Sequence, residues 1–428
     1  MKDQAATYTH SERGHPVRER GPGGFPAIEP FTQNLREAWW HSDRSFVPLQ
    51  RRYAREEQRA NERQMRETIE GSIQSLQTVS SNDLERDALQ RRMLADFARF
   101  GQRTIGLTET QIECLMTGGL FEVGRAFCQA ARKGDPDMDA APILQALRNV
   151  WAMNGIQMLL GLPVTLTESI FAYSMLYPYT DNYLDDETVA PELKRAFSQR
   201  FAQRLRGEDV LPTNPQEARI FAMVELIEEE HDRQQYPEVY ESLLAIHRSQ
   251  TKSLRLLTSD TAPYEIDVLG IALEKGGASV VADGYLVART LTPEQARFLY
   301  GWGAVLQLVD DLQDVEQDRK AGLMTVFSQA AGRWPLDGLT NRTMQMGEQV
   351  MRGLDAFDAP GIEPLKEMTA QSVQSLLLYA AGGARRYHSR RYIAALEEYV
   401  PFRFRAARRA QSRLERHRAL LEGWFLSW

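Results

Sequence analysis

Cysteine is nearly absent from this chain of 428 residues, which contains only Cys114 and Cys128. Two thiols are too few for the disulfide framework of a small secreted domain, and also for a multi-cysteine zinc or iron–sulfur site. We expect both cysteines to be buried as small apolar side chains. This cysteine content favours a reducing compartment, so we expect a cytoplasmic protein.

Long hydrophobic runs are missing as well. A membrane-spanning helix needs about 20 apolar residues, and the best candidates here, residues 156–164 and 376–381, are far shorter. Residues 1–24 are polar and rich in Gly and Arg, without the apolar segment of an export signal. We therefore predict a flexible tail over residues 1–30.

A large excess of either charge is absent too. The chain has 51 Lys and Arg residues against 58 Asp and Glu residues, a net charge of −7. Without a domain-wide basic surface, we do not expect nucleic acid to be the main partner. No phosphate-binding loop, serine-hydrolase elbow or HExxH zinc motif occurs in the sequence.

Alternating apolar and polar residues, the pattern typical of β-strands, are also scarce. From residue 31 onward, apolar residues recur at three- and four-residue spacing, which predicts helices almost throughout. Helix-start signals include Thr108 and Thr292. We predict one all-α domain over residues 31–428, with helices that include residues 35–66, 142–160, 168–185, 263–288, 293–316 and 402–424.

Two clusters of aspartates each follow an apolar, helical segment. The first is DNYLDD at residues 181–186, in which Asp181 and Asp185 share a helix face. The second is DDLQDVEQD at residues 310–318, in which Asp310, Asp314 and Asp318 form a row at four-residue spacing. Asp311 is turned by about 100° from that row.

Like charges four residues apart destabilise a helix, and burying them costs more. A divalent cation removes this cost, and Mg²⁺ commonly bridges one or two carboxylates to substrate phosphates. The simpler interpretation is a solvated acidic surface. Two clusters that both end apolar helices favour instead a Mg²⁺–diphosphate site between them.

The two clusters resemble the aspartate-rich motifs of class I isoprenoid synthases, over roughly residues 140–400. This resemblance implies a large single-domain isoprenoid-synthase-like helix bundle around a central apolar cavity. It also implies Mg²⁺ as cofactor. In a terpene-synthase register the second motif binds metal through Asp310, Asp314 and Asp318, and in a prenyl-synthase register through Asp310, Asp311 and Asp314. The full set of implied metal ligands is Asp181, Asp185, Asp186, Asp310, Asp311, Asp314 and Asp318.

The segment at residues 274–286 looks similar to one in bacterial large-terpene synthases of the tetraprenyl-β-curcumene type. Two features differ from prenyl-chain-elongating enzymes. The first motif is DxxxDD rather than DDxxD, and no Gly-Gly-Lys-x-x-Arg segment precedes it. The resemblance therefore implies a class I terpene synthase that ionises one prenyl diphosphate.

A departing diphosphate needs cationic partners. The resembling families place a diphosphate-binding lysine near the position of Lys275, and we expect Gly276-Gly277 to kink the helix there. Arg319 and Lys320 follow the second motif and could reach the same phosphates. An Arg-Tyr pair is expected further on, and the sequence leaves two alternatives, Arg386-Tyr387 and Arg391-Tyr392.

An allylic carbocation needs a dry pocket with aromatic faces. We expect that some of the aromatic side chains near the motifs line it: Phe171, Tyr173, Tyr177, Tyr285 and Trp302. The arginine-rich segment at residues 403–418, followed by aromatics, could lie on an anionic membrane surface or could cap the bundle.

Several alternatives stay open at this point. A prenyl transferase, either chain-elongating or of the head-to-head squalene/phytoene type, is the second interpretation. A non-catalytic helical binding protein is the third. The sequence does not fix the oligomeric state, and a homodimer is one alternative.

Overall fold

The computed structural model describes residues 25–46, 49, 51–78, 83–185, 189–257 and 265–426. Within these ranges every regular element is a helix and no strand occurs, so the predicted all-α class is confirmed. One large cluster of buried apolar side chains runs from Trp39 to Phe404. The predicted tail boundary at residue 30 falls inside the first helix, α1 (Ile28–His41).

Two central helices, α11 (Val268–Ala288) and α12 (Pro293–Gln313), pack unusually closely. A Cβ atom added to Gly303 would lie 2.1 Å from the carbonyl oxygen of Gly276, and one added to Gly276 would lie 2.3 Å from that of Gly303. Helix α11 runs through Gly276 and Gly277 without interruption. The expected kink is therefore not present as a break. Gly276 instead lets the two backbones touch, and Gly277 leaves room for the ring of Tyr300.

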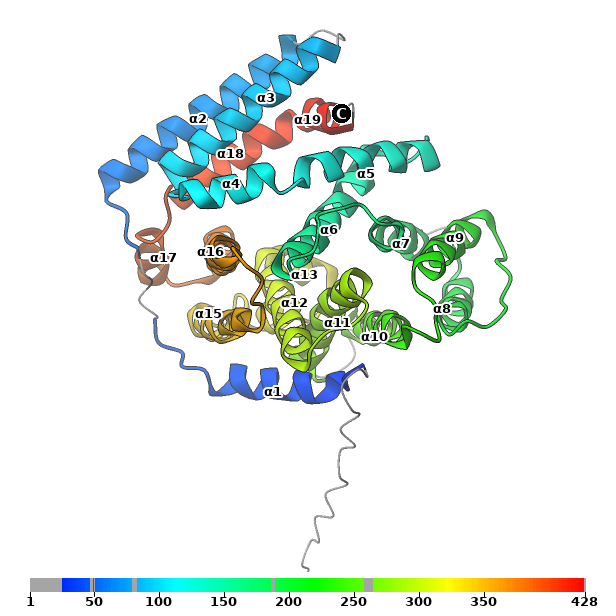
Figure 1. Ribbon diagram of the computed structural model, residues 1–428. Coiled ribbons are helices and arrows are strands. Elements are labelled where there is room, and N and C mark those ends of the chain that lie inside the picture. Colours follow the sequence, from blue (N-terminus) through cyan, green and yellow to red (C-terminus); the bar gives the residue numbers. More distant parts are fainter. Residues whose placement is uncertain are drawn as a thin grey trace, which may run out of the picture.

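The other helices of the bundle surround this pair (Figure 1). Helices α1, α6, α7 and α10 pack against α11, while α1, α14, α15 and α16 pack against α12. Their bounds are α6 Ala140–Leu159, α7 Glu168–Asp185, α8 Pro191–Leu205, α9 Pro215–Glu230, α10 Pro237–Ser253, α13 Val315–Ala321, α14 Val326–Ala330, α15 Asp337–Met351, α16 Glu363–Gly383 and α17 Arg390–Glu397.

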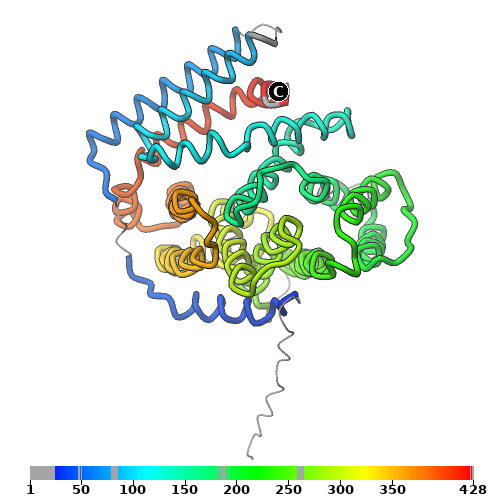
Figure 2. The backbone as a smooth tube through the Cα atoms, viewed as in Figure 1, coloured from blue at the N-terminus to red at the C-terminus, as the bar shows by residue number. Residues whose placement is uncertain are grey.

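A second group of helices crosses the bundle on the side away from α1 (Figures 1 and 2). It brings residues from early in the chain against the C-terminal helices, since α2 packs with α3, α18 and α19. The bounds are α2 Arg55–Thr78, α3 Asp83–Phe100, α4 Glu109–Thr117, α5 Leu120–Gly134, α18 Phe404–Arg416 and α19 Arg418–Leu426.

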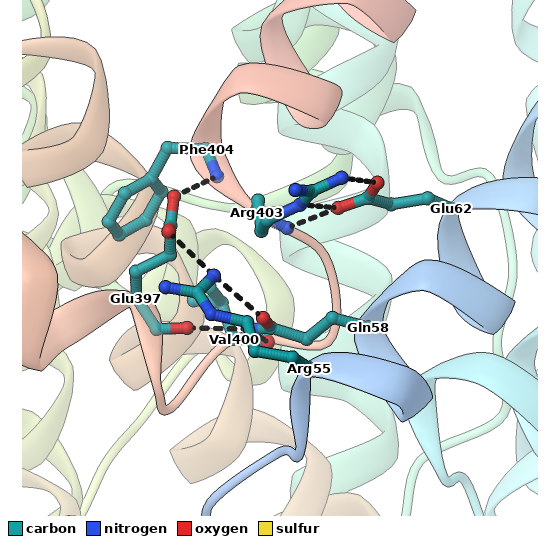
Figure 3. Close-up of polar contacts among 7 residues, drawn as sticks. All are labelled: Arg55, Gln58, Glu62, Glu397, Val400, Arg403 and Phe404. Carbon is teal, nitrogen blue, oxygen red and sulfur yellow. Dashed lines mark hydrogen bonds and ion pairs between the residues drawn. The ribbon is translucent and has the colours of Figure 1, made fainter.

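A set of matched polar contacts, which we call the α2–α18 clamp, joins these segments (Figure 3). The backbone N, Nε and Nη2 of Arg403 donate to the carboxylate of Glu62 over 3.1, 2.7 and 2.6 Å. Arg55 donates to Glu397 over 2.9 Å. The amide of Gln58 donates to the carbonyl of Val400 over 2.9 Å. Every charged group of the clamp therefore has a partner of opposite sign.

Four predicted helices are shorter in the structure, and the one predicted over residues 263–288 begins at Val268. The helix predicted over residues 35–66 is two helices, because α1 ends at His41 and α2 begins at Arg55. Asp43 accepts a hydrogen bond from the amide of Ser45 over 3.0 Å, a local turn that competes with helix. The helix predicted over residues 402–424 is likewise split between α18 and α19, and that over 293–316 ends at Gln313.

Helix α1 is fastened to the bundle by buried polar contacts. The hydroxyls of Thr32 and Tyr300 are 2.6 Å apart. Arg342 on α15 donates to the carbonyl of Trp39 over 2.8 Å and also to that of Trp40. These contacts hold α1 to α12 and α15, and α1 also packs against α11. Over the described ranges, no helix is both long enough and apolar enough to cross a membrane.

Candidate functional site

Four aspartates of the second motif gather where α12 meets α13; we call Asp310, Asp311, Asp314 and Asp318 the aspartate cluster. Asp314 is the single residue between the two helices. Its amide donates to the carbonyl of Asp310 over 2.8 Å, and the amide of Asp318 donates to that of Asp314 over 2.9 Å. Helical hydrogen bonding thus continues across the junction, and the predicted four-residue row is retained.

Asp311 points inward from this row. It is buried, and its Oδ1 accepts a hydrogen bond of 2.9 Å from Nε2 of Gln307. Its Oδ2 is buried without a hydrogen-bond partner. Burial, the largest cause, and the nearby charge of Asp318 raise the pKa of Asp311 to about 7. A buried carboxylate oxygen without a partner is costly, so this group can accept another cation or donor.

The negative charges of the other three carboxyls in the cluster are also not fully offset by nearby cations. Burial and the charge of Asp314 raise the pKa values of Asp310 and Asp318 to about 6 each. Asp310 nevertheless touches solvent, being exposed at the surface of the cluster. Burial also raises the pKa of Asp314. These carboxyls hold more negative charge than the protein around them compensates.

Lys275 on α11 is a cation whose charge acts on several of these groups. Its charge lowers the pKa values of Asp310, Asp311 and Asp318 and so opposes the rise. Within the described ranges Lys275 forms no ion pair, and its neighbour Glu274 is paired with Lys252 at 2.5 Å. The close approach of Gly276 to Gly303 brings Lys275 to this place. Lys275 is therefore available to a ligand.

Arg148 on α6 is a second cation near the cluster, and its charge lowers the pKa of Asp310. The sequence analysis did not identify it, because nothing in the pattern of α6 distinguishes Arg148 from other exposed arginines. Its proximity to Asp310 shows that α6, α11 and α12 all contribute to this end of the bundle.

The first Arg-Tyr alternative lies against α13. Arg386 forms an ion pair of 3.0 Å with Glu316, and the hydroxyl of Tyr387 donates to the same carboxylate. Arg319 donates to the Tyr387 hydroxyl over 3.1 Å, and Lys320 lies 3.4 Å from Glu316. These hydrogen bonds and cations lower the pKa of Glu316, with Tyr387 as the largest cause.

The second Arg-Tyr alternative is placed differently. Tyr392 is buried and donates to Oδ1 of Asn341 over 2.6 Å. Its ring stacks on that of His388 at 5.5 Å. Arg391 beside it is exposed. The structure therefore brings Arg386-Tyr387, and not Arg391-Tyr392, against the helix that follows the aspartates.

For the first motif, the structure gives only the course of the backbone. Asp181 and Asp185 are in α7, but their side chains, and Asp186 altogether, lie outside the described residues. Tyr183, between them, packs its ring on Phe197 of α8 at 4.8 Å.

Contacts between the next helices connect this end of α7 to Lys275. Ser198 of α8 is 3.4 Å from His247 of α10, and two residues later Ser249 donates to Glu274 over 3.2 Å. Glu274 directly precedes Lys275. The backbone therefore carries the first motif to the same end of the bundle as the second, and a pairing of their side chains across a cavity remains a prediction.

Most of the aromatic side chains expected in the pocket pack against other rings. Tyr177 has 44% of its surface exposed. Tyr173 donates to the carbonyl of Ser279 over 3.5 Å, and burial raises its pKa. Three form ring pairs at 5.5–5.9 Å: Phe171 is 5.7 Å from Phe127, Tyr285 is 5.5 Å from Phe25 and Trp302 is 5.9 Å from Phe298.

A buried acid lies deeper in the bundle, below Tyr173. Asp283 on α11 is 1% exposed and accepts a hydrogen bond of 3.2 Å from Asn149 on α6. Burial raises its pKa well above 3.8. Asp283 follows Lys275 by two helical turns, about 12 Å along the axis. The sequence analysis missed it because a lone Asp in an apolar helix carries no spacing signal.

Two recesses on the surface lie elsewhere. One of about 250 Å³ is bounded by α2 and α3, and one of about 480 Å³ lies around Arg52 and Tyr53. Neither is lined by the aspartate cluster or by Lys275. The central apolar cavity therefore remains a prediction.

The donor set suits a hard cation. In the described ranges no three His, Cys, Asp or Glu side chains are placed so that they alone could hold a metal. Mg²⁺ does not require such a cage, because it is usually bound through one or two carboxylates together with substrate phosphates. The partnerless Oδ2 of Asp311 and the raised pKa values of its neighbours fit a cation that arrives with a ligand.

Comparisons with known proteins give little. No protein-family model matches the chain, and no curated protein matches it. Among solved structures, it is similar to a chain from Marinomonas sp. MED121 described as a "putative farnesyl-diphosphate synthase". The two are 15% identical, with a TM-score of 0.35, over 59% of this chain and 97% of that chain. A likeness this distant carries no argument about function.

Proposed function

We propose that this protein is a Mg²⁺-dependent class I terpene synthase that ionises a prenyl diphosphate. One observation carries the proposal: four clustered aspartates with raised pKa values lie beside a lysine that has no ion-pair partner in the described ranges. A structural salt-bridge network would instead pair these charges. An arrangement that is unbalanced without a ligand is typical of a functional site.

The aspartate cluster, together with Asp181, Asp185 and Asp186 of the first motif, would hold the metal. Mg²⁺, when bound, supplies charge stabilisation to the phosphate oxygens. Lys275 and Arg386 would add positive charge where the leaving diphosphate becomes more negative, which is the interaction that lowers the barrier. Arg319 and Lys320 are close enough to Arg386 to contribute. No protein nucleophile is required.

The prenyl chain would extend from Lys275 along α11 toward Tyr173. Apolar and aromatic surface there would keep water from the carbocation. Tyr173 and the buried Asp283 would set the polar limit of this space. The prenyl-transferase and binding-protein interpretations remain as outcomes of the experiment below.

The test is incubation with prenyl diphosphates of ten to thirty-five carbons, with Mg²⁺ or with EDTA, followed by mass spectrometry of the products and assay of released diphosphate. We expect a Mg²⁺-dependent hydrocarbon or alcohol product. Longer prenyl diphosphates formed only after isopentenyl diphosphate is added would favour a chain-elongating enzyme. A linear dimer of two substrates would favour a head-to-head synthase. If no substrate releases diphosphate, the result would favour the non-catalytic helical binding protein.

Arg386 and Arg391 provide a matched pair of variants. Arg386→Ala should lower kcat/KM by about tenfold, since removing a partly exposed cation costs less than removing a preorganised one. Arg391→Ala should leave it unchanged. Equal effects, or a larger effect at Arg391, would contradict the assignment of Arg386 to the diphosphate.

A further inference from the structure

Three arginines come together where α18 crosses the end of α16. The ring of Phe404 packs on Gly382 so closely that an added Cβ would lie 2.2–2.6 Å from it. Arg385, one turn after Gly382, therefore lies beside Arg405 and Arg408, which follow Phe404 within the first turns of α18. Arg385 and Arg405 are exposed, and Arg408 is half-buried.

These three guanidinium groups differ from the neighbouring Arg403, which is bonded to Glu62. In the part of the chain that the structure describes, no carboxylate forms an ion pair with Arg385, Arg405 or Arg408. Burial, and then the charges of Arg385 and Arg405, lower the pKa of Arg408. The group is thus a local concentration of positive charge on a protein with net charge −7.

An exposed tryptophan lies at the edge of this basic group. Trp334 is 65% exposed and belongs to a short exposed segment, residues 332–335. The amide of Leu336 donates to the carbonyl of Tyr387 over 2.9 Å, which fixes this segment beside Arg385 and Arg386. Trp334 therefore presents a large aromatic side chain to solvent beside these cations.

We propose that Trp334, Arg385, Arg405 and Arg408 form a docking surface for an anionic phospholipid membrane. Arginine binds phosphate groups through paired N–H donors, and tryptophan prefers the headgroup region of a bilayer. This combination favours a membrane over nucleic acid, which would be expected to need a longer basic track and several stacking rings. The proposal does not depend on the catalytic function proposed above.

The structure also limits how the contact is made. The sequence suggested that the whole arginine-rich segment could lie on a membrane, but α18 packs against α2 and α16. Its apolar side is therefore not free to insert. Contact through α18 would be electrostatic, with Trp334 as the single apolar anchor.

The experiment is sedimentation of the full chain with phosphatidylglycerol/phosphatidylcholine vesicles and with pure phosphatidylcholine vesicles. We expect binding to the anionic vesicles only, lost at 1 M salt because exposed charges are then screened. The double variant Arg385→Glu/Arg405→Glu should bind at least about 25-fold more weakly, at about fivefold per arginine. The control Arg195→Glu/Arg206→Glu, which changes the net charge equally in α8 and at the residue that caps its end, should bind like the parent.

Trp334 is tested separately. Trp334→Ala should weaken vesicle binding several-fold, and the parent should show quenching by brominated lipids that this variant loses. Trp40→Ala, which removes another exposed tryptophan, should change neither. Circular dichroism checks that all variants are folded. Equal binding to neutral vesicles, equal loss in both charge variants, or tight binding of a short RNA in place of vesicles would each overturn the proposal.

Discussion

Two groups of charged side chains in this protein are built in opposite ways. In the α2–α18 clamp, three N–H groups of Arg403 meet Glu62, and these hydrogen bonds lower the pKa of its carboxyl. In the aspartate cluster, burial raises the pKa values of the carboxyls and one oxygen has no partner. The clamp stabilises the fold as it stands, whereas the aspartate cluster costs stability until a cation and its ligand arrive.

The largest expected effect is on turnover. Asp310→Ala or Asp314→Ala should lower kcat for prenyl diphosphate ionisation by about 10²–10³, the usual loss when a preorganised charge-stabilising group is removed. The midpoint of thermal unfolding without metal should stay the same or rise slightly, because like charges are relieved. Unchanged diphosphate release in both variants would remove the mechanistic proposal.

The register of the second motif follows from the same assay. If Asp310, Asp314 and Asp318 bind metal, Asp311→Ala should be milder than Asp318→Ala. The reverse order would favour the register Asp310, Asp311 and Asp314. Asp311 already bonds to Gln307, so its variant needs a parallel measurement of stability.

The contact between α11 and α12 gives the next effect. Gly303→Ala would place a methyl group against the carbonyl of Gly276, so we expect a loss of about 3 kcal/mol in the free energy of unfolding and a fall in kcat as Lys275 moves. Gly155→Ala in α6 is the matched control, since nothing lies within 4 Å of its added Cβ. It should be neutral or stabilising by about 0.5–1 kcal/mol. Urea unfolding measures the free energy of unfolding of both variants. If Gly303→Ala were as stable as the parent, the close contact would be unimportant.

Breaking the clamp should affect stability and not chemistry. Glu62→Ala should lower the free energy of unfolding by about 1.5–3 kcal/mol, the range for hydrogen bonds to charged groups, with kcat of the folded enzyme unchanged. Glu398→Ala removes a longer, exposed pair at 3.7 Å from Arg52 and should cost under about 1 kcal/mol. A change in kcat for Glu62→Ala, measured at a temperature where the variant is fully folded, would contradict a purely structural role for the clamp.

The smallest effect is a pH dependence at Asp283. Its raised pKa means that the folded protein keeps a proton that the unfolded chain releases above about pH 4. The unfolded state therefore binds fewer protons at neutral pH, and stability falls as pH rises. Asp283→Asn removes this penalty. Its free energy of unfolding, measured with urea relative to the parent, should improve more at pH 8 than at pH 4.5, and an equal difference at both would show that Asp283 is ionised when folded.

The fold class followed from periodicity, and several helix starts followed from single residues. Thr108 and Thr292 form reciprocal capping boxes with Gln111 and Gln295, as their sequence signals predicted. The breaks after His41 and at Asp314 could not be predicted from apolar spacing, because the pattern continues through both. The turn at Asp43 and the helix junction at Asp314 depend on local backbone geometry, which the spacing of apolar residues does not reveal.

The site was predictable where its residues form a motif. Asp310, Asp314 and Asp318 have a fixed spacing, and their row is retained in the structure. Lys275 was found through a resemblance, but its approach depends on Gly303, whose role is visible only when two helices touch. Packing between distant segments brings Arg148 near Asp310 and Arg386 against Glu316. Asp181, Asp185 and Asp186 stay predictions.

The fastening of α1 has a consequence for synthesis of the chain. Arg342 holds the carbonyl of Trp39 from 303 residues further along, and Tyr300 meets Thr32 from 268 residues away. At about 5–20 residues per second, ribosomes take roughly 15–60 s to make the intervening chain. Trp39, only 1% exposed in the finished protein, spends that time without its partner. Helix α1 is synthesised early, but its contacts with Arg342 and Tyr300 are among the last to form. A chaperone that covers α1 would act in this interval.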